Sequence, residues 1–579
     1  MTGTVAYEAN PAYPPLGDAP GATVLRGWPH AVATLPSAPF VLAIDGPAIL
    51  DWSALVTGIT KALSGAGTSA EWLDLRAHFA PWEKIVAATE SAALPEDPDF
   101  ATLATHELGD LFEELPEPDP TADPTAGRSA LVVFGPGAAL VHHDVLWYAD
   151  LPKRHAEAAV VDGTGRNLGQ TDDAGAGTTK RLFYIDWPIL DRHRDAIAGR
   201  IDRWIDTRDS ANPSSLDGET LRRTAAALAT RPFRTRPTFN TSSWGGHWAQ
   251  QELGHNPEAR NTALGYELIA PESGVLIGQA TGAQVELPFQ LVVSQRPVEI
   301  LGERVHAQFG TSFPIRFDYL DTVGGGNLSV HCHPQSDYMR RVFGWPYTQH
   351  ETYYILLGGE DRQVFLGLND GTDLEVFHHR ARTADDHGVP FDIEEYVQTF
   401  PATPHQLFLI PAGTPHGSGE GNVVLEVSAT PYLYSLRFYD WLRRDEKERQ
   451  RPVHVRHAFA NLDRRRRGPA VREQLVQQPR VLRSGTGWHE ELLGSSPEMF
   501  FEVRRLVVEA GRAAQDDTDG RFHVLNVVEG NGVAVETGSG HRHDLAYAET
   551  MVVPASVGPY LVRALGPDRA RIVKSLVTS

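Results

Sequence analysis

The sequence has very little cysteine, no long apolar run and no surplus of positive charge. Cys332 is the only cysteine among 579 residues, so an intrachain disulfide is excluded and a reducing, cytoplasmic location is expected. No run of about 18 or more apolar residues occurs that could cross a bilayer, and no charged-then-apolar signal begins the chain. We therefore expect a cytoplasmic protein without a membrane partner.

The charge balance bears on the partners of the chain. Asp and Glu number 74 against 52 Lys and Arg, which gives a formal net charge of −22. Nucleic acid is therefore not expected as a partner, because neutralising phosphates requires clustered Lys and Arg. The dense basic run 464–467 lies in a polar linker and is expected to be a solvated face, with an anionic ligand or a partner contact as the alternative.

The length is too great for one core and predicts several domains. Residues 1–235 alternate apolar runs at 40–44 and 130–134, typical of buried parallel strands, with predicted helices at 52–63 and 191–207. Alternation of this kind favours an α/β fold. Two polar stretches rich in Gly, Pro or Asp are predicted loops: 114–127 and 162–179.

Beyond residue 236 the chain changes to short β runs separated by Gly and Pro, among them 274–278, 286–293 and 407–410, which indicates β-barrels or sandwiches. We expect two such domains, 236–455 and 456–579. Residues 409–416, Leu-Ile-Pro-Ala-Gly-Thr-Pro-His, align with 552–559, Val-Val-Pro-Ala-Ser-Val-Gly-Pro. Pro559 stands where the first copy has His416, so we infer a duplicated barrel whose second copy cannot hold a metal.

Four residues of the first β domain form a candidate metal site: His331, His333, Glu351 and His416. The two histidines of His-x-His lie on one face of an extended strand, because side chains repeat every second residue. Imidazoles with a carboxylate suit Zn²⁺ or another divalent first-row ion. The alternative is that these are unrelated surface residues. Cys332 is expected to face the opposite side as a small buried hydrophobe.

Residues 328–334, Leu-Ser-Val-His-Cys-His-Pro, resemble the Leu-Ser-x-Gln-x-His-Pro signature of type I mannose-6-phosphate isomerases, which are zinc-dependent cupins. Further phrases are similar to those of that family and occur in the expected order: 244–248, 348–354, 411–416 and 426–441. The resemblance covers roughly 236–579. It implies that both β domains are cupin barrels and that the four residues above are the metal ligands.

The same resemblance implies the remaining site residues. Arg437 corresponds to the catalytic or phosphate-facing arginine, and Glu426 to a glutamate that acts as the base or orients a ligand histidine. The chain departs from the family twice. His331 replaces the usual Gln, which a metal accepts, and Gln349 replaces a lysine two residues before the ligand Glu, which removes one positive charge.

Near the N-terminus, residues 44–53 resemble the strand, loop and helix of a nucleoside-kinase P-loop. A working P-loop needs glycines and a lysine to meet phosphate. Asp51 and Trp52 occupy the places of the last Gly and the Lys. The resemblance therefore implies a degenerate, P-loop-kinase-like α/β domain without catalysis, with a role in interaction or regulation.

Three functions remain open at this point. The first is a metal-dependent isomerase that interconverts mannose 6-phosphate and fructose 6-phosphate. The second is an isomerase or epimerase of a different sugar or sugar derivative, phosphorylated or not, which the loss of lysine at Gln349 favours. The third is a non-catalytic sugar-sensing or scaffold cupin. All three imply a small sugar or sugar phosphate as the partner, and the sequence leaves the oligomeric state, a homo-oligomer included, undecided.

Overall fold

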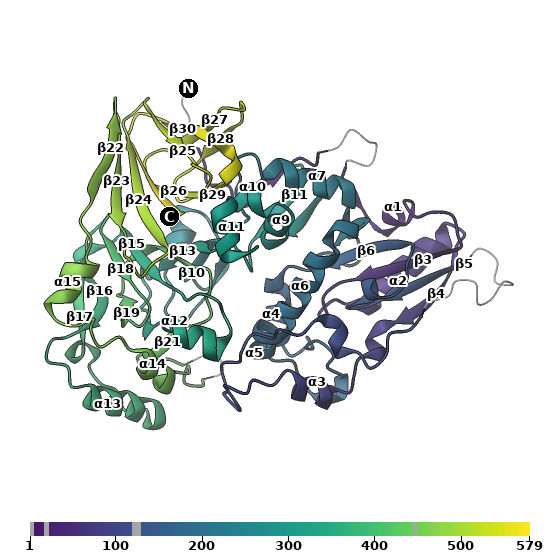
Figure 1. Cartoon of the computed structure of the whole chain (residues 1–579), viewed down its shortest axis with the longest axis horizontal. Coiled ribbons are helices and arrows are strands. Elements are labelled where there is room, and N and C mark those ends of the chain that lie inside the picture. The colour runs from purple at the N-terminus through teal and green to yellow at the C-terminus, as the bar shows by residue number, and fades with distance from the viewer. Residues whose placement is uncertain (1–4, 17–22, 118–128, 445–447, 579) are drawn as a thin grey trace.

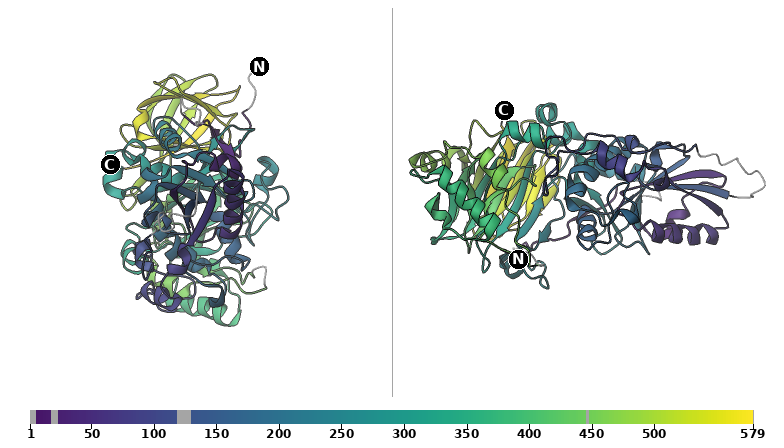
Figure 2. Two further views of the ribbon diagram at one scale, coloured as in Figure 1. Left: turned by 90° about the vertical axis from the view of Figure 1, so that its right-hand side faces the viewer. Right: turned by 90° about the horizontal axis from the view of Figure 1, so that it is seen from below.

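A computed structural model describes residues 5–16, 23–117, 129–444 and 448–578. The molecule is elongated, with an α/β region at one end and two β-rich regions stacked at the other (Figures 1 and 2). The expected multidomain, sheet-rich fold is confirmed. Within these ranges, no helix is long and apolar enough to cross a membrane.

The N-terminal region is built on one seven-stranded sheet (Figure 1). Its strands, in spatial order, are β2 (Leu25–Arg26), β8 (Ser214–Asp217), β7 (Arg203–Asp206), β6 (Val145–Asp150), β3 (Phe40–Asp45), β5 (Ser129–Phe134) and β4 (Ser69–Asp74). All pairs among β3, β4, β5, β6 and β7 are parallel, while β8 pairs antiparallel with both β7 and β2. Continuous apolar runs suit these central strands because both of their faces are covered.

The loop after β3 is pressed against β6. A Cβ on Gly46 would lie 2.2 Å from the carbonyl oxygen of Ala149, so only glycine fits there. Asp51 then caps helix α2 (Trp52–Gly65) by accepting a hydrogen bond from the amide of Ala54 at 2.9 Å. Trp52 is 1% exposed and packs in the core of the sheet. Both unusual residues of the loop are therefore used within the fold itself.

Two predicted elements near this sheet are wrong in part. The helix expected over 191–207 is α6 (Trp187–Ile197) followed by a short 3₁₀ turn and then strand β7. Trp204 and Ile205 are fully buried between β6 and β8, so pairing within the sheet overrides the helical spacing of apolar residues. The β run expected over 286–293 is β12 (Gln284–Pro288) followed by helix α9 (Phe289–Gln295).

The predicted loops have separate outcomes. Residues 162–179 contain only a 3₁₀ turn, at 172–174, before helix α5 (Thr179–Arg181) begins, so a loop is confirmed there. Residues 118–127 of the other predicted loop lie outside the described residues.

Two antiparallel sheets make the first barrel (Figure 1). One contains β18 (Leu407–Ile410), β15 (Glu351–Leu357), β20 (Val423–Ala429), β13 (Ile315–Asp321), β10 (Leu264–Leu268) and β9 (Thr238–Asn240). The other contains β17 (Val397–Ala402), β16 (Gly359–Leu368), β19 (His416–Ser418), β14 (Val330–Cys332) and β21 (Leu436–Tyr439).

The second barrel repeats this order of strands. Its larger sheet contains β29 (Thr550–Val553), β26 (His523–Glu529), β31 (Ala570–Val577), β24 (Phe501–Val508), β23 (Trp488–Gly494) and β22 (Arg480–Gly485). Its smaller sheet contains β28 (Arg542–Leu545), β27 (Val533–Thr537), β30 (Pro559–Ala564) and β25 (Ala513–Asp517). The repeated phrases of the sequence thus lie at equivalent places, between β18 and β19 and between β29 and β30.

The segment between the barrels is more structured than a solvated linker. Helices α14 (Val455–Asn461) and α15 (Pro469–Leu475) pack there. Arg464 and Arg465 are exposed, but Arg466 is 7% exposed and pairs with Glu498. The expectation of a wholly solvated basic run is therefore wrong at Arg466, which fixes the linker to the second barrel.

Candidate metal centre

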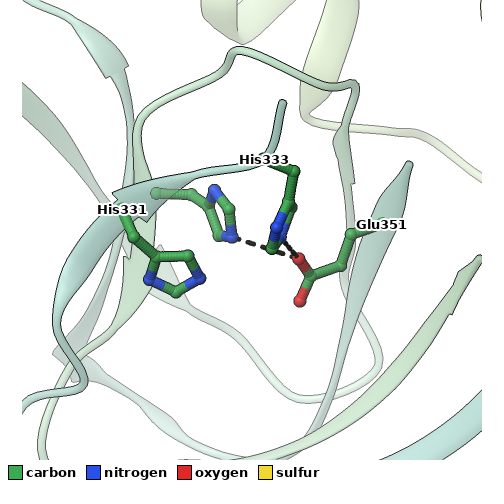
Figure 3. A group of neighbouring side chains, drawn as sticks. His331, His333 and Glu351 are labelled. Atoms are coloured by element: carbon green, nitrogen blue, oxygen red, sulfur yellow. Dashed lines mark hydrogen bonds and ion pairs between the residues drawn. The ribbon is translucent and has the colours of Figure 1, made fainter. Parts of the chain in front are cut away.

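Three neighbouring strands bring the predicted ligands together. His331 lies on β14 directly opposite His416, which begins β19, and Glu351 begins β15. His333 follows the end of β14. One donor atom from each residue falls within 4.8 Å of all the others. Figure 3 shows the side chains of His331, His333 and Glu351 pointing toward one another. All four residues are 5% exposed or less.

Backbone carbonyls orient the three imidazoles. The Nδ1 atoms of His331 and His416 lie 2.9 Å from the carbonyl oxygens of residues two positions earlier. That of His333 lies 3.2 Å from the carbonyl oxygen of Tyr434. Because a carbonyl can only accept, the Nδ1 atoms of His331 and His416 carry the proton and their Nε2 atoms present lone pairs to the centre of the site.

These lone pairs converge on a carboxylate. Glu351 Oε2 lies 3.1 Å from His416 Nε2 and also contacts His333 Nε2. Burial lowers the pKa of His331, and His416 and His333 lower it further. Electron-pair donors thus face one another in a buried space, which is the chemistry of a cation site.

A second buried cluster lies beside the ligands; it contains the predicted Glu426, whereas its Arg316 and Asp318 were not predicted from the sequence. Arg316 on β13 pairs with Glu426 on β20 and lies 3.6 Å from Asp318. Ser428 donates to Glu426 Oε1 at 2.7 Å. Burial raises the pKa of Glu426, Arg316 opposes that rise, and Asp318 and Glu351 add to it. Glu426 therefore lies next to the metal ligands but does not orient any of their imidazoles.

Gln349 lies in this cluster as well. Its amide fits with the oxygen accepting from Arg316 Nη2 at 2.8 Å and the nitrogen donating to the carbonyl of Pro431 at 2.7 Å. The positive charge that the sequence lacks at position 349 is therefore present nearby, on the guanidinium of Arg316 from β13. Arg316 is 5% exposed, and Glu426 and Asp318 neutralise its charge locally.

Arg437 lies at the edge of the site. It is the register partner of His331 across β14 and β21. Its Nη1 donates to the carbonyl of Pro452 at 3.1 Å, and its buried Nε has no hydrogen-bond partner within the described part of the chain. Cys332, by contrast, lies in the core behind the strand and directs its thiol toward the carbonyl of Ala458 at 3.6 Å. It is not among the grouped donors.

Comparison with known proteins matches the two parts of the chain differently. Residues 27–230 match a sequence family described only as a domain of unknown function, DUF8485. The probable mannose-6-phosphate isomerase GmuF of Bacillus subtilis (strain 168) is 24% identical over 339 residues, which cover 58% of this chain and 96% of the relative. The mannose-6-phosphate isomerase ManA of the same organism is 22% identical with the same coverage.

Solved structures of similar proteins were also found. The mannose 6-phosphate isomerase from Bacillus subtilis matches with a TM-score of 0.47 and 19% identity, covering 60% of this chain and 99% of that one. A putative mannosephosphate isomerase from Archaeoglobus fulgidus matches with a TM-score of 0.45 and 20% identity, covering 60% and 98%. The sequence relatives establish homology to mannose-6-phosphate isomerases over part of the chain.

Proposed function

We propose that the chain is a metal-dependent isomerase that interconverts a mannose-type aldose and the matching ketose, with mannose 6-phosphate as the first substrate to test. The observation that carries this proposal is the convergence of three imidazole Nε2 atoms and one carboxylate in a buried site. The homology to mannose-6-phosphate isomerases supports it.

The donor set fits a divalent first-row ion, of which Zn²⁺ is the one most often held by imidazole and carboxylate together. His331, His333, Glu351 and His416 would hold it. When bound there, the ion would supply Lewis-acid chemistry, polarising sugar oxygens and stabilising the negative charge that develops on them.

Glu426 is the proposed proton carrier. Aldose–ketose isomerisation moves a proton between C1 and C2, and a carboxyl group whose pKa is shifted toward neutrality can both take and return it. Burial shifts the pKa of Glu426 in that direction. The other role open to it, orienting a ligand histidine, is already filled by the backbone carbonyls.

Arg437 and Arg316 are proposed to hold substrate oxygens. A guanidinium is a fixed planar donor, and it stays charged throughout the reaction. Burial lowers the pKa of Arg437 to about 10, which is still well above neutral pH, so the side chain remains a cation there. Its unpartnered Nε offers one donor for an incoming hydroxyl or enediolate oxygen.

The test is turnover by the metal-loaded chain. Wild type is expected to isomerise at least one sugar from a panel of free hexoses and their 6-phosphates, and Glu426→Gln is expected to reduce kcat by about 10²–10⁴ without loss of metal, the usual contribution of a general base. Chelation should abolish turnover. Binding of sugar without turnover, at full metal content, would overturn the proposal in favour of a non-catalytic sugar-sensing protein.

The second candidate is an unphosphorylated substrate. Gln349 is neutral where the resembling family has lysine, and the nearby Arg316 is already neutralised by Glu426 and Asp318. Comparing each free sugar of the panel with its own 6-phosphate separates the two candidates.

We propose in addition that the N-terminal α/β domain has the outline of a P-loop kinase without its nucleotide site. Asp51 caps α2 in the place where phosphate would bind, and Trp52 is buried where a lysine is needed. Titration of the full chain with ATP should show no binding, and a dissociation constant tighter than about 1 mM would contradict this.

A further inference from the structure

The α/β region and the first barrel region meet along an extended boundary. Residues 94–106 cross it: the amide of Leu103 donates to the carbonyl of Phe343 at 3.0 Å, and Asp99 lies 3.7 Å from His454 Nε2. Two cavities on this boundary are lined by residues from both regions. One of them contains polar groups that the fold does not use.

The smaller cavity has a volume of about 50 Å³ and lies at the carboxyl end of strand β6. Its walls come from the loop after β3, helix α4 (Lys153–Val161), helix α6 and two stretches of the barrel region, 271–274 and 286–288. Helices α4 and α6 lie on the side of the α/β region that faces the barrels (Figure 1). Open α/β sheets bind their ligands outside the carboxyl ends of their parallel strands, so this position suits a ligand.

Two polar side chains of β6 line this cavity without a partner. Asp150 is 6% exposed and Tyr148 is 3% exposed, and their positions two residues apart place both side chains on one face of the strand. Within the described ranges, neither the carboxylate of Asp150 nor the hydroxyl of Tyr148 has a hydrogen-bond or ion-pair partner. The bonds that Thr207 donates to Asp150 go to its backbone carbonyl. Buried polar groups are normally hydrogen-bonded, so these two indicate a partner from outside the chain.

The cations that line the same cavity are already paired. Lys153 and Arg194 bind the two carboxylate oxygens of Asp191, at 2.5 and 2.9 Å. Glu286, another lining carboxylate, is bound by three arginines: Arg154, Arg208 and Arg236. An incoming anion would therefore have to break one of these ion pairs, whereas an incoming cation would not.

Two lining carboxylates have no cation bound to them in the described part of the chain. One is Asp150, and the other is Glu272, which accepts from the hydroxyl of Tyr432. Burial raises the pKa of Asp150 to about 7, and Arg194 opposes that rise only in part. Two carboxylates and the phenol oxygen of Tyr148 match the three N–H donors of a primary ammonium group. These side chains are not among the donors that group closely enough to hold a metal ion.

A larger cavity adjoins the first. It has a volume of about 230 Å³, and aromatic side chains that include Phe183 and Trp345 line it. An apolar cavity of about 150 Å³ is enough to bind benzene, so this space can take a ring or a short alkyl chain. Four residues line both cavities: Lys153, Trp187, Asp191 and Pro271.

We propose that these two cavities bind a small primary amine with an apolar body. Its ammonium group donates to Asp150, Tyr148 and Glu272 in the smaller cavity, and its apolar part lies in the larger cavity beside Trp187. Because both regions of the chain line the site, a bound amine stabilises the contact between them. None of the four grouped metal donors lines either cavity, so this inference does not depend on the proposed isomerase function.

The first test is calorimetric titration of the metal-loaded full chain with n-propylamine, benzylamine and 2-phenylethylamine, each paired with the alcohol of the same skeleton. The pH is set about one unit above the pKa of Asp150, so that its carboxylate is ionised. At least one amine should bind with a dissociation constant below about 1 mM, and at least about tenfold more tightly than its alcohol, because hydrogen bonds to charged groups are the stronger ones. Alcohols that bind as tightly as the amines, or no binding by any amine, would overturn the inference.

The second test uses variants that change one polar group each. Asp150→Asn keeps the size of the side chain and should weaken amine binding by at least about tenfold, whereas Tyr148→Phe removes only a hydroxyl and should weaken it by about threefold to tenfold. The matched control is Asp162→Asn, because Asp162 is exposed at the end of α4 and does not line either cavity. It should bind the amine within about twofold of wild type.

Metal content and melting temperature are measured for every variant to check that it is folded. An amine affinity of Asp150→Asn equal to that of wild type would overturn the inference. If Asp150→Asn does not fold, Tyr148→Phe and the comparison of amines with alcohols on wild type still decide it.

Discussion

The two barrels place different residues at the same register positions around their smaller sheets. In the first barrel β14 and β19 bring His331 opposite His416. In the second barrel the corresponding strands, β25 and β30, bring Asp517 opposite Pro559. Proline has no side-chain donor, and an aspartate alone cannot replace a pair of imidazoles. The second barrel therefore lacks the two ligands that the first barrel takes from this pair of strands.

The two barrels also differ at the first residue of an equivalent strand in their larger sheets. Glu351 begins β15 opposite Ile410, and His523 begins β26 opposite Val553. Both apolar partners are followed by proline. A carboxylate in the first barrel has thus become an imidazole in the second.

The inward-facing charges of the larger sheets are reversed as well. Glu426 pairs in register with Asp318 in the first barrel, whereas Lys574 pairs with Arg504 in the second. Lys574 is 1% exposed, and its ammonium contacts Asp516 Oδ2 at 2.7 Å and also Glu490. Lys574 is the buried cation of the second barrel, whereas the first barrel holds the guanidinium of Arg316 and, beside it, the grouped donors of the candidate metal site.

The largest expected effect is loss of the metal. His416→Ala should reduce the metal content from one ion per chain to none and lower turnover by more than about a hundredfold. Loss of a residue that only hydrogen-bonds to a ligand already costs about 10- to 100-fold, and loss of a ligand itself should cost more. Metal analysis and kinetics measure this. His523→Ala, in the equivalent barrel, should keep one ion per chain, and a wild-type content of two ions would break the comparison.

Removing the built-in cation should be the next largest effect. Lys574→Met removes the fully buried cation between Glu490 and Asp516 and leaves them paired with the partly exposed Arg483, at a cost of about 3 kcal/mol in the free energy of unfolding. Denaturant titration measures the loss, and hydrogen exchange should locate it on β26 and β31. Metal content should not change. A loss below about 1 kcal/mol would show that the ammonium is not what holds this barrel together.

A smaller effect concerns acid. Burial and the nearby Lys574 lower the pKa of His523 to about 3, while an unfolded histidine titrates near 6.5. The folded state therefore binds fewer protons, and the stability contributed by this group is complete above about pH 6.5 and declines as the pH falls toward 3.

Between pH 7 and 5, wild type should lose about 2 kcal/mol more than His523→Gln, because the unfolded imidazole takes up a proton that glutamine cannot. Thermal unfolding of the metal-loaded proteins at the two pH values measures the difference. Equal slopes for the two proteins would mean that His523 is protonated in the folded barrel.

The grouping of the ligand residues could be foreseen because the motifs that contain them are short and chemically distinctive. His-x-His on a strand fixes two donors, and the Pro-Ala-Gly-Thr-Pro-His turn marks a third. Arg316 gave no such signal, because its strand, Ile315–Asp321, reads as ordinary alternation, and only the fold shows that the polar residues face inward.

The position of Asp99 could not be predicted from the sequence, for a different reason. Its contact with His454 joins residues 355 positions apart and depends on how the α/β domain lies against the barrel. The strand at Arg203–Asp206 was wrongly predicted as part of a helix, because apolar residues at 197, 201, 204 and 205 fit a helix as well as a strand. Short apolar runs do not distinguish the two, and pairing with neighbouring strands decides.

Residues 94–106, which run from the α/β region onto the first barrel, also determine whether the two barrels can be produced without that region. Phe100 is 3% exposed, and its ring lies 4.7 to 5.4 Å from those of Phe343, His454 and His457. A shortened chain that began near residue 236 would lack Phe100 and would expose to water the rings of Phe343, His454 and His457 that it covers. Exposed apolar patches of that kind promote self-association, so the isolated barrels are expected to self-associate more strongly than the whole chain.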